Sequence, residues 1–311
     1  VIEQPRQRRV RSLDHRARIV ATPVLEWAEG RRSGRVLGVA TGSVHLAFEP
    51  GVVVVTNATR PLMPNGVAIA IDKPDPSLGG VVAHGQRAIL DPTGLSAGGL
   101  YVHWDDAVAA WEPAITSGRW DCSSVVARAV GVLERLGMAR PDSGSPARLT
   151  VDVDVPGFAM GDGAVPMVID ALLAALRRRD ADRAAFAAAA LCGRGEGLTP
   201  VGDDVLAAAL VTLAAMAPSV GLSSTECRRL TVALAGPALA GPALAGRTTA
   251  MSHTLLRLAA QGRTLEPVIS VLDLEDQHDW PPALERLLGI GHTTGSTYAY
   301  SIGATAWSLA S

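Results

Sequence analysis

The stretch RVLGVATGSVHLAFEPGVVVVT, residues 35–56, contains three short apolar runs separated by two groups of turn-forming residues. Thr41-Gly42-Ser43 and Glu49-Pro50-Gly51 supply the glycine and proline that favour tight turns. Short runs rich in valine and bounded by such residues are typical of β-strands. We therefore expect three consecutive strands here, with no helix between them.

The same pattern extends to about residue 104. Residues 61–66 and 92–94 are further turn segments, each rich in proline and glycine. The strands expected in this region are Arg35–Ala40, Val44–Phe48, Val52–Thr56, Val67–Ile71, Arg87–Leu90 and Leu100–Trp104. Short strands at this spacing, without intervening helices, predict an antiparallel barrel or sandwich.

After Asp105 the pattern becomes helical. Asp121 or Ser123 is expected to cap a helix that ends near Leu136. Further helices are expected at Pro166–Arg179, Ala181–Leu191, Pro200–Ala217, Ser224–Ala235, Thr249–Gln261, Pro282–Leu288 and Tyr298–Leu309. The fold class is thus α+β, with a basic flexible arm at 1–18, a β-rich domain at 19–115 and a mainly helical domain at 116–311.

Three other segments have less specific patterns. Nine arginines against four acidic residues in 1–35 would suit a phosphate or an acidic partner, but also a solvated tail. The repeat of Leu-Ala-Gly-Pro-Ala at 234–246 is expected to break a helix at each Gly-Pro. Residues 139–147 resemble a linker, and Leu149–Val155 alternates like a half-exposed strand.

Composition excludes several classes of function. Hydrophobic residues make up 48% of the 311 residues, which is enough for a sizeable core and excludes a disordered chain. The formal net charge is −2, so we expect no nucleic-acid partner. Lys73 is the one lysine and lies in a turn-like Asp-Lys-Pro-Asp-Pro segment, which argues against Schiff-base or phosphate-loop lysine chemistry.

The cysteines and apolar segments favour a cytoplasmic protein with no membrane partner. Cys122, Cys192 and Cys227 are far apart and lack Cys-x-x-Cys spacing, so we expect neither disulfides nor a zinc site. The first twenty residues contain no apolar stretch of signal-peptide length. The longest apolar run, 205–217, is too short to span a bilayer.

The strongest motif is GRGEGLTPVGDD at residues 193–204, and we call Gly193–Pro200 the first glycine loop. Thr199 suits the N-cap of a helix and Pro200 suits its first position. The glycines allow a ligand close to the backbone, where free N–H groups and the helix dipole favour an anion.

Asp203 and Asp204 follow in the first turn of this helix. Their charge is stabilised by the dipole, but they would repel a phosphate unless Mg²⁺ or an arginine lies between. Alternatively, they hydrogen-bond an amide N–H of a substrate. No cofactor is firmly implied, and Mg²⁺ is the one that these carboxylates suggest.

Two more glycine loops open helices. The second glycine loop, Gly246–Thr249, offers an arginine and two hydroxyls at a helix start, which suits a phosphate or carboxylate. The third glycine loop, Gly289–Thr297, contains His292, the best histidine candidate because its neighbours are small. No histidine in the chain has metal-ligand spacing, and a lone histidine is also compatible with a structural role.

Three motifs in order, GEGLTPVGDD at 195–204, RTTAMS at 247–252 and GHTTG at 291–295, resemble a bacterial domain family of unknown function. One member of that family is a subunit of the oxamate carbamoyltransferase of anaerobic allantoin breakdown. The resemblance implies purine nitrogen catabolism, in which oxalurate and phosphate give oxamate and carbamoyl phosphate. It also implies other protein subunits and a small anionic substrate: oxalurate, oxamate, carbamoyl phosphate or phosphate. This chain lacks the Ser-x-Arg-Thr and His-Pro motifs of the aspartate and ornithine transcarbamoylases.

Carbamoyl transfer requires donors for phosphate and for a tetrahedral oxyanion. We expect Asp203, Asp204 and His292 to be catalytic, with an aspartate orienting the amide nitrogen and His292 polarising the carbamoyl oxygen or moving a proton. The backbone N–H groups of Gly195–Gly197, with an arginine, are expected to bind phosphate. The expected binding residues are Arg194, Gly195, Gly197, Thr199, Arg247, Thr248, Thr249, Ser252, Gly291, Thr293, Thr294 and Gly295.

Two alternatives remain open. The chain is a non-catalytic scaffolding or ligand-binding subunit if its Ala-rich helices pack against a partner. It is a metal-dependent amidohydrolase if Asp152, Asp154, Asp203 or Asp204 ligate a metal, although no paired-histidine motif supports this.

Overall fold

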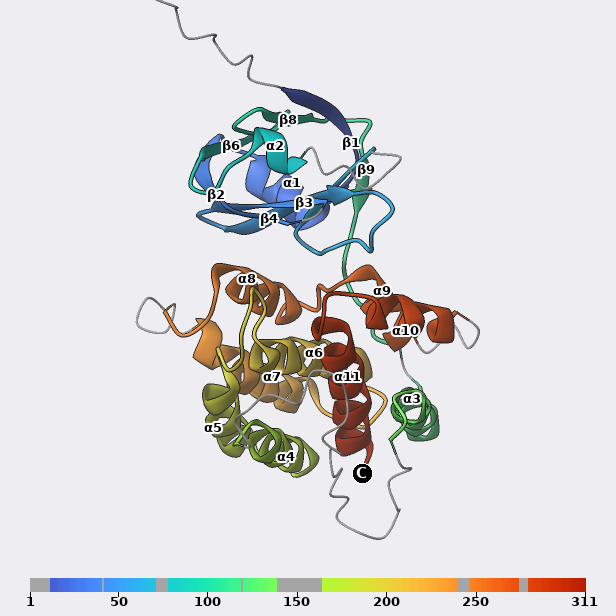
Figure 1. The fold of residues 1–311 in the computed structure, drawn as a ribbon. Coiled ribbons are helices and arrows are strands. Elements are labelled where there is room, and N and C mark those ends of the chain that lie inside the picture. The colour runs from blue at the N-terminus through green and yellow to red at the C-terminus, as the bar shows by residue number, and fades with distance from the viewer. Residues whose placement is uncertain are drawn as a thin grey trace, which may run out of the picture. The chain divides into compact units, whose positions relative to one another are not determined.

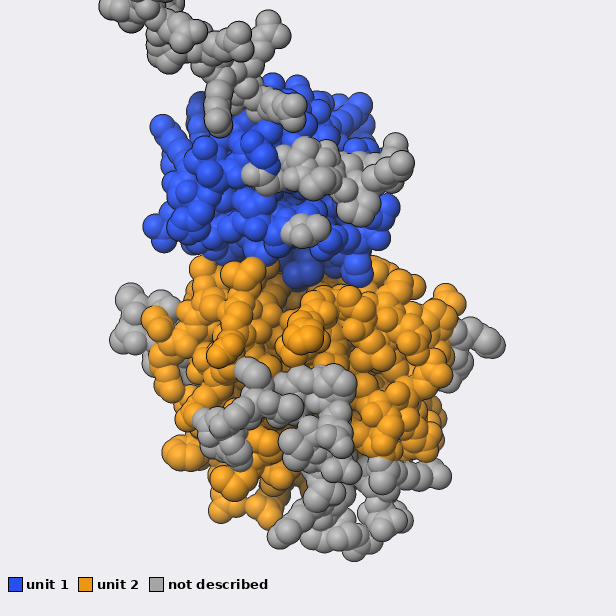
Figure 2. Space-filling view, viewed as in Figure 1, with its two compact units in different colours: residues 1–112 blue, residues 113–311 orange. Residues whose placement is uncertain are grey.

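The computed structural model describes residues 12–40, 42–70, 78–118, 120–138, 164–239, 246–273 and 279–311. The chain divides into two compact units, Val1–Glu112 and Pro113–Ser311 (Figure 2). The division after Glu112 lies close to the predicted boundary after residue 115, and the class is α+β as predicted.

The first unit is a closed β-barrel (Figure 1). Its strands are β1 (Leu13–Ala21), β2 (Arg32–Ala40), β3 (Ser43–Phe48), β4 (Gly51–Asn57), β5 (Gly66–Ile69), β6 (Arg87–Asp91), β7 (Gly94–Ala97), β8 (Leu100–His103) and β9 (Ala109–Trp111). The sheet order is β5-β4-β3-β2-β6-β7-β8-β1-β9, and an additional β1–β5 pairing closes the barrel. Two short helices, α1 (Thr22–Ala28) and α2 (Leu78–Val81), belong to this unit.

The predicted barrel is confirmed, but its pairing is not purely antiparallel. β4–β5, β1–β8 and β1–β9 are parallel, and the other neighbouring pairs are antiparallel. The interior contains fully buried aliphatic side chains from most strands, including Val36, Leu46, Val55, Ile69 and Leu100. The valine-rich runs in the sequence therefore supply the core of this unit.

The predicted basic arm is wrong for residues 13–18, because β1 begins at Leu13. The strand alternates between exposed residues, Asp14, Arg16 and Arg18, and partly or fully buried residues between them. This alternation is typical of a strand with one solvent-exposed face. The Arg16 guanidinium forms a 2.7 Å ion pair with Asp105 on that face. The charged positions belong to the outside of the barrel wall.

The second unit is helical in its described part (Figure 1). Its helices are α3 (Cys122–Arg135), α4 (Ala164–Arg177), α5 (Ala181–Leu191), α6 (Val201–Met216), α7 (Ser224–Leu239), α8 (Ala250–Ala259), α9 (Glu266–Leu272), α10 (Trp280–Leu288) and α11 (Thr294–Ala310). α6 is buried around nearly its whole circumference, since it packs against α5, α7, α8 and α11. In this described part, no helix is both long and apolar enough to cross a membrane.

Most helix predictions agree with the structure, including the Asp121 cap of α3, whose carboxylate accepts from the Ser124 N–H at 2.8 Å. The predicted break at Gly236-Pro237 is wrong, since α7 continues to Leu239. The proline lies in the last turn, so its missing N–H removes only one bond near the helix end. The rest of the repeat at 240–245, the linker, the strand predicted at 149–155 and the arm residues 1–11 lie outside the described residues.

Candidate functional site

Hydrogen bonds bring the three glycine loops together in the second unit. The Thr249 hydroxyl of the second loop donates to the Leu198 carbonyl of the first loop at 2.5 Å. The hydroxyls of Thr199, in the first loop, and Thr294, at the start of α11, are 3.1 Å apart. The N-termini of α6, α8 and α11 therefore meet at one place, which we call the loop junction. Because each helix N-terminus carries a partial positive charge, the junction favours negative groups.

Asp203 connects the first and second loops at this junction. Its carboxylate accepts a 2.8 Å hydrogen bond from the Gly193 N–H and a second from the Thr248 hydroxyl. The side chain is buried, which raises its pKa, while the bonds from Thr248 and Gly193 act in the opposite direction. Its oxygens thus hold two parts of the chain together, as expected for a residue that positions the site.

Asp204 faces the third loop and has a more unusual environment. It is 2% exposed, and among the described residues its Oδ2 has no hydrogen-bond partner. Burial raises its pKa well above the usual range, and the charge of Asp203 adds to this, although Thr294 and Thr199 act against it. Two neighbouring carboxylates with different environments are the arrangement that separates an acid from a base.

Tyr298 is a residue of this site that the sequence did not reveal. It is fully buried, one turn into α11, and burial raises its pKa well above the usual range, with further contributions from the charges of Asp204 and Asp203. Cys192 is buried beside Asp203, and burial followed by that charge raises the pKa of its thiol to about 11. The i to i+4 spacing from Thr294 to Tyr298 was the available signal, but a tyrosine in an apolar helix is usually part of the core.

The raised pKa of Asp204 predicts a pH-dependent stability. A carboxyl group whose pKa is higher in the folded than in the unfolded state makes its full contribution to the stability of the fold below its unfolded-state pKa, which is about 3.9. This contribution is lost as the pH rises through the folded-state pKa. Asp204→Asn does not titrate, so thermal unfolding from about pH 4 to 8 is expected to show the variant gaining stability relative to the wild type. Ser301→Ala, which removes no titrating group, should keep a constant difference, and a constant difference for Asp204→Asn would contradict the prediction.

The start of α6 differs from the expected cap. Pro200 is the N-cap, and its carbonyl accepts from the N–H groups of Asp203 and Asp204 at 2.9 and 3.1 Å. The Thr199 hydroxyl is directed to Thr294 instead, because the extended backbone at Pro200 starts the helix one residue later. In α8 the predicted cap is confirmed, since the Thr249 hydroxyl accepts from the Ser252 N–H at 3.0 Å.

The first loop leaves backbone donors unused. Gly195 and Gly197 have φ values of +111° and +92°, which glycine adopts without strain. The N–H groups of Gly195, Glu196 and Gly197 donate no hydrogen bond to the described residues. These exposed donors are compatible with anion binding next to α6.

The two expected phosphate-binding arginines lie at the C-terminal end of α5, next to the start of the first loop. Arg247 Nη2 donates to the Ala189 carbonyl at 2.8 Å, and Arg194 Nε donates to the Ala190 carbonyl at 3.2 Å. Both side chains are exposed and satisfy the last carbonyls of α5, where cations are favoured by the helix dipole. The structure brings the arginines together, but each already has a backbone partner.

The third loop places its residues in three different environments. His292 is exposed, and within the described residues no hydrogen bond or ion pair joins it to Asp203 or Asp204. Gly291 turns the chain with a φ of +63°, and the Thr293 carbonyl accepts from the Thr297 N–H at 3.0 Å. Gly295 does not line the loop junction as expected, because it is buried against α10, where an added Cβ would lie 2.0 Å from the Leu287 carbonyl oxygen.

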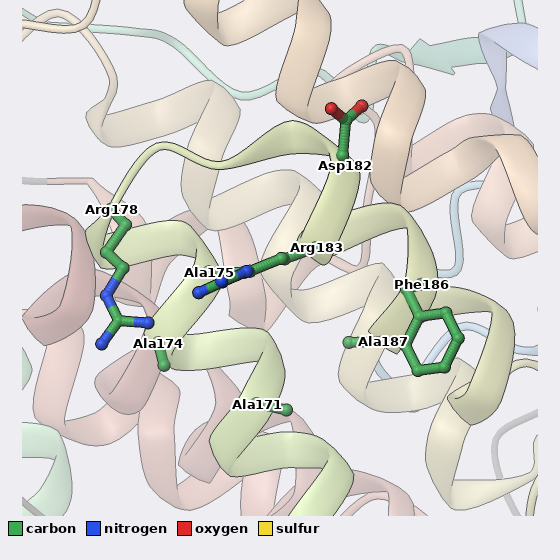
Figure 3. Close-up of a pocket in the computed structure, with 8 residues that line it drawn as sticks. All are labelled: Ala171, Ala174, Ala175, Arg178, Asp182, Arg183, Phe186 and Ala187. Carbon is green, nitrogen blue, oxygen red and sulfur yellow. The ribbon is translucent and has the colours of Figure 1, made fainter.

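A separate groove of about 460 Å³ lies between α4 and α5 (Figure 3). Its floor is formed by alanines, and Arg178, Arg183 and Phe186 surround it. Phe186 is 80% exposed, and Met167 is 69% exposed on the α4 face that also carries Ala171. None of the predicted site residues lines this groove.

No three His, Cys, Asp or Glu side chains of the described ranges gather as metal ligands. Asp203 and Asp204 lie within those ranges, whereas Asp152 and Asp154 lie outside them. The amidohydrolase alternative therefore gains no support from the described aspartates.

The family model described as oxamate carbamoyltransferase subunit AllH matches residues 191–305. This segment includes all three glycine loops, and the match confirms the resemblance on which the expected site rests. No curated protein and no solved structure matches the chain.

Proposed function

We propose, starting from the AllH match, that this chain is the subunit of a carbamoyltransferase-type complex that binds a small anionic amide at the loop junction. The observation that carries the proposal is the meeting of all three matched loops around two buried carboxylates, Asp203 and Asp204. Burying two adjacent carboxyl groups is costly, and their retention among three helix N-termini supports a binding role at this place.

The reaction suited to this site is phosphorolysis of oxalurate. A phosphate oxygen attacks the carbamoyl carbon, the bond from that carbon to the amide nitrogen breaks, and the nitrogen takes a proton to give oxamate beside carbamoyl phosphate. The free N–H groups of the first loop would bind the phosphate, with the exposed faces of Arg194 and Arg247 nearby. His292 would polarise the carbamoyl oxygen or deliver the proton, and Asp204, with its raised pKa, would hold the amide nitrogen.

A thermal-shift experiment tests the binding role. Oxalurate, oxamate, carbamoyl phosphate and phosphate are each added, with and without Mg²⁺, to the purified chain and to the chain co-expressed with its complex partners. A ligand at about 100 times its Kd stabilises by about 2.7 kcal/mol, which raises the Tm by about 5–10 °C for a unit of this size. Arg183→Ala, in the distant groove, should keep the shift. If no ligand raises the Tm of either preparation, the proposed function is wrong.

The groove between α4 and α5 favours a second candidate function, a scaffolding subunit. Exposed Phe186 and Met167 beside an alanine floor are more typical of a contact between proteins than of a solvated face. If the reconstituted complex remains active when its subunit carries both Asp204→Asn and His292→Ala, the result favours this candidate. Loss of activity with the complex still assembled would favour the binding role.

A further inference from the structure

Each helix that begins at the loop junction has a buried oxygen without a hydrogen-bond partner in its first turn. These atoms are Asp204 Oδ2 in α6, Ser252 Oγ in α8 and Thr297 Oγ1 in α11. Their residues are 2%, 1% and 0% exposed, and partners were sought among all described residues. Buried polar atoms are nearly always hydrogen-bonded, and leaving one without a partner is costly. Three such atoms together indicate a group that the described residues do not supply.

The contacts of their neighbours place these three atoms at the same junction. Thr248 connects the start of α8 to Asp203, and Ser252 lies close enough to Asp203 to lower its pKa. Thr294 lies close enough to Asp204 to lower the pKa of that carboxyl, and Thr297 is one turn further along α11.

The chemistry of the three atoms selects the ligand. A carboxylate oxygen accepts a hydrogen bond, whereas serine and threonine hydroxyls can also donate one. An amide offers an N–H to the carboxylate and a carbonyl oxygen to a hydroxyl, while the helix N-termini favour an attached negative charge. Oxalate carries no N–H, so it leaves the accepting oxygen of Asp204 without a donor.

We propose that Asp204, Ser252 and Thr297 bind the carboxamide group of an anionic amide, with Asp204 accepting from its N–H and the two hydroxyls donating to its oxygens. This inference rests on the proposed function, because it assigns the ligand contacts within that same site. It distinguishes Asp204, which contacts the ligand, from Asp203, whose oxygens are occupied by Gly193 and Thr248.

The chain provides a matched control for this proposal. Ser301 and Ser308 also have buried hydroxyls without a partner among the described residues, but they lie beyond the first turn of α11. Ser301→Ala therefore makes the same chemical change as Ser252→Ala, away from the junction. Thr297→Ser retains the hydroxyl and serves as the conservative variant for Thr297→Val.

Calorimetric titration of the full chain, alone and in its complex, with oxamate and with oxalate tests the proposal. The wild type is expected to bind oxamate at least about tenfold more tightly than oxalate, and Ser252→Ala and Thr297→Val should each weaken oxamate about tenfold. Ser301→Ala should bind like the wild type, and Thr297→Ser should bind oxamate more tightly than Thr297→Val because it keeps the hydroxyl. Asp204→Asn should lose the preference for oxamate over oxalate, because the asparagine amide donates to a carboxylate as well as it accepts from an N–H. The Tm of each variant shows whether it is folded.

The outcomes separate this inference from the proposed function. If folded Ser252→Ala and Thr297→Val bind oxamate with the same affinity as the wild type, the assignment of these contacts is overturned and the proposed function still stands. If the wild type binds oxalate and oxamate equally tightly, the assignment of an amide as the ligand is overturned. A wild-type chain and complex that bind none of the probes, oxalurate and phosphate included, overturn the proposed function and this inference with it.

Discussion

Asp203→Ala is expected to lower the free energy of unfolding of the helical unit by about 2–4 kcal/mol and to abolish ligand binding, since two donors lose their acceptor at once. The Gly193 N–H and the Thr248 hydroxyl would both remain next to a cavity. The second glycine loop would then lose one of its attachments to the first. Urea unfolding followed by circular dichroism measures the loss, and oxamate titration measures the binding.

Asp203→Asn and Asp182→Ala complete this experiment. Asparagine keeps one acceptor oxygen, so Asp203→Asn should lose roughly half as much stability as Asp203→Ala. Asp182 is exposed in the first turn of α5, and its replacement should cost less than about 1 kcal/mol. If Asp203→Ala costs no more than Asp182→Ala, then Asp203 does not hold the loops together.

Gly193→Ala is expected to be the most damaging single-methyl change in the first loop. The backbone has a φ of +75°, and an added Cβ would lie 1.7 Å from the Arg247 carbonyl oxygen. That contact is with backbone, so it is relieved only by moving the second loop away from the first. We expect a loss of at least about 3 kcal/mol, together with loss of ligand binding.

Gly197→Ala is the matched control, because it combines a similar backbone with open space. Its φ is +92°, and nothing lies within 4 Å of the added Cβ. Only the strain of the left-handed backbone remains, which costs about 1–2 kcal/mol. Equal losses for the two variants would show that close packing of the loops is not what Gly193 provides.

Local sequence patterns predicted most of the fold. The valine-rich runs between turn residues became β2, β3 and β4, and the helix predicted at Ala181–Leu191 has those same bounds. β1 was missed because its alternating arginines resemble a charged tail when only composition is considered. The parallel β4–β5 pairing was missed because nothing local distinguishes it from a hairpin.

The candidate site was predictable in its parts but not in its connections. The glycine loops and both aspartates were visible as motifs, because helix starts require particular residues. Asp203 accepts hydrogen bonds from other parts of the chain, whereas Asp204 keeps a buried oxygen without a partner among the described residues. This difference depends on contacts between residues that lie 45 to 95 positions apart in the sequence. Tyr298, buried in the last helix, had no signal that separated it from ordinary core residues.

The closure of the barrel by β1 has a consequence for synthesis on the ribosome. β1 is made first in the unit, yet it pairs with β8 and β9, which are made last. At about 5–20 residues per second, β1 waits on the order of 10 s for these partners to be translated. During that interval its unpaired edges are exposed to other chains. The helical unit differs, because the contacts within each helix form as soon as that helix has been synthesised. We therefore expect the barrel to depend on chaperones in the cell more than the helical unit does.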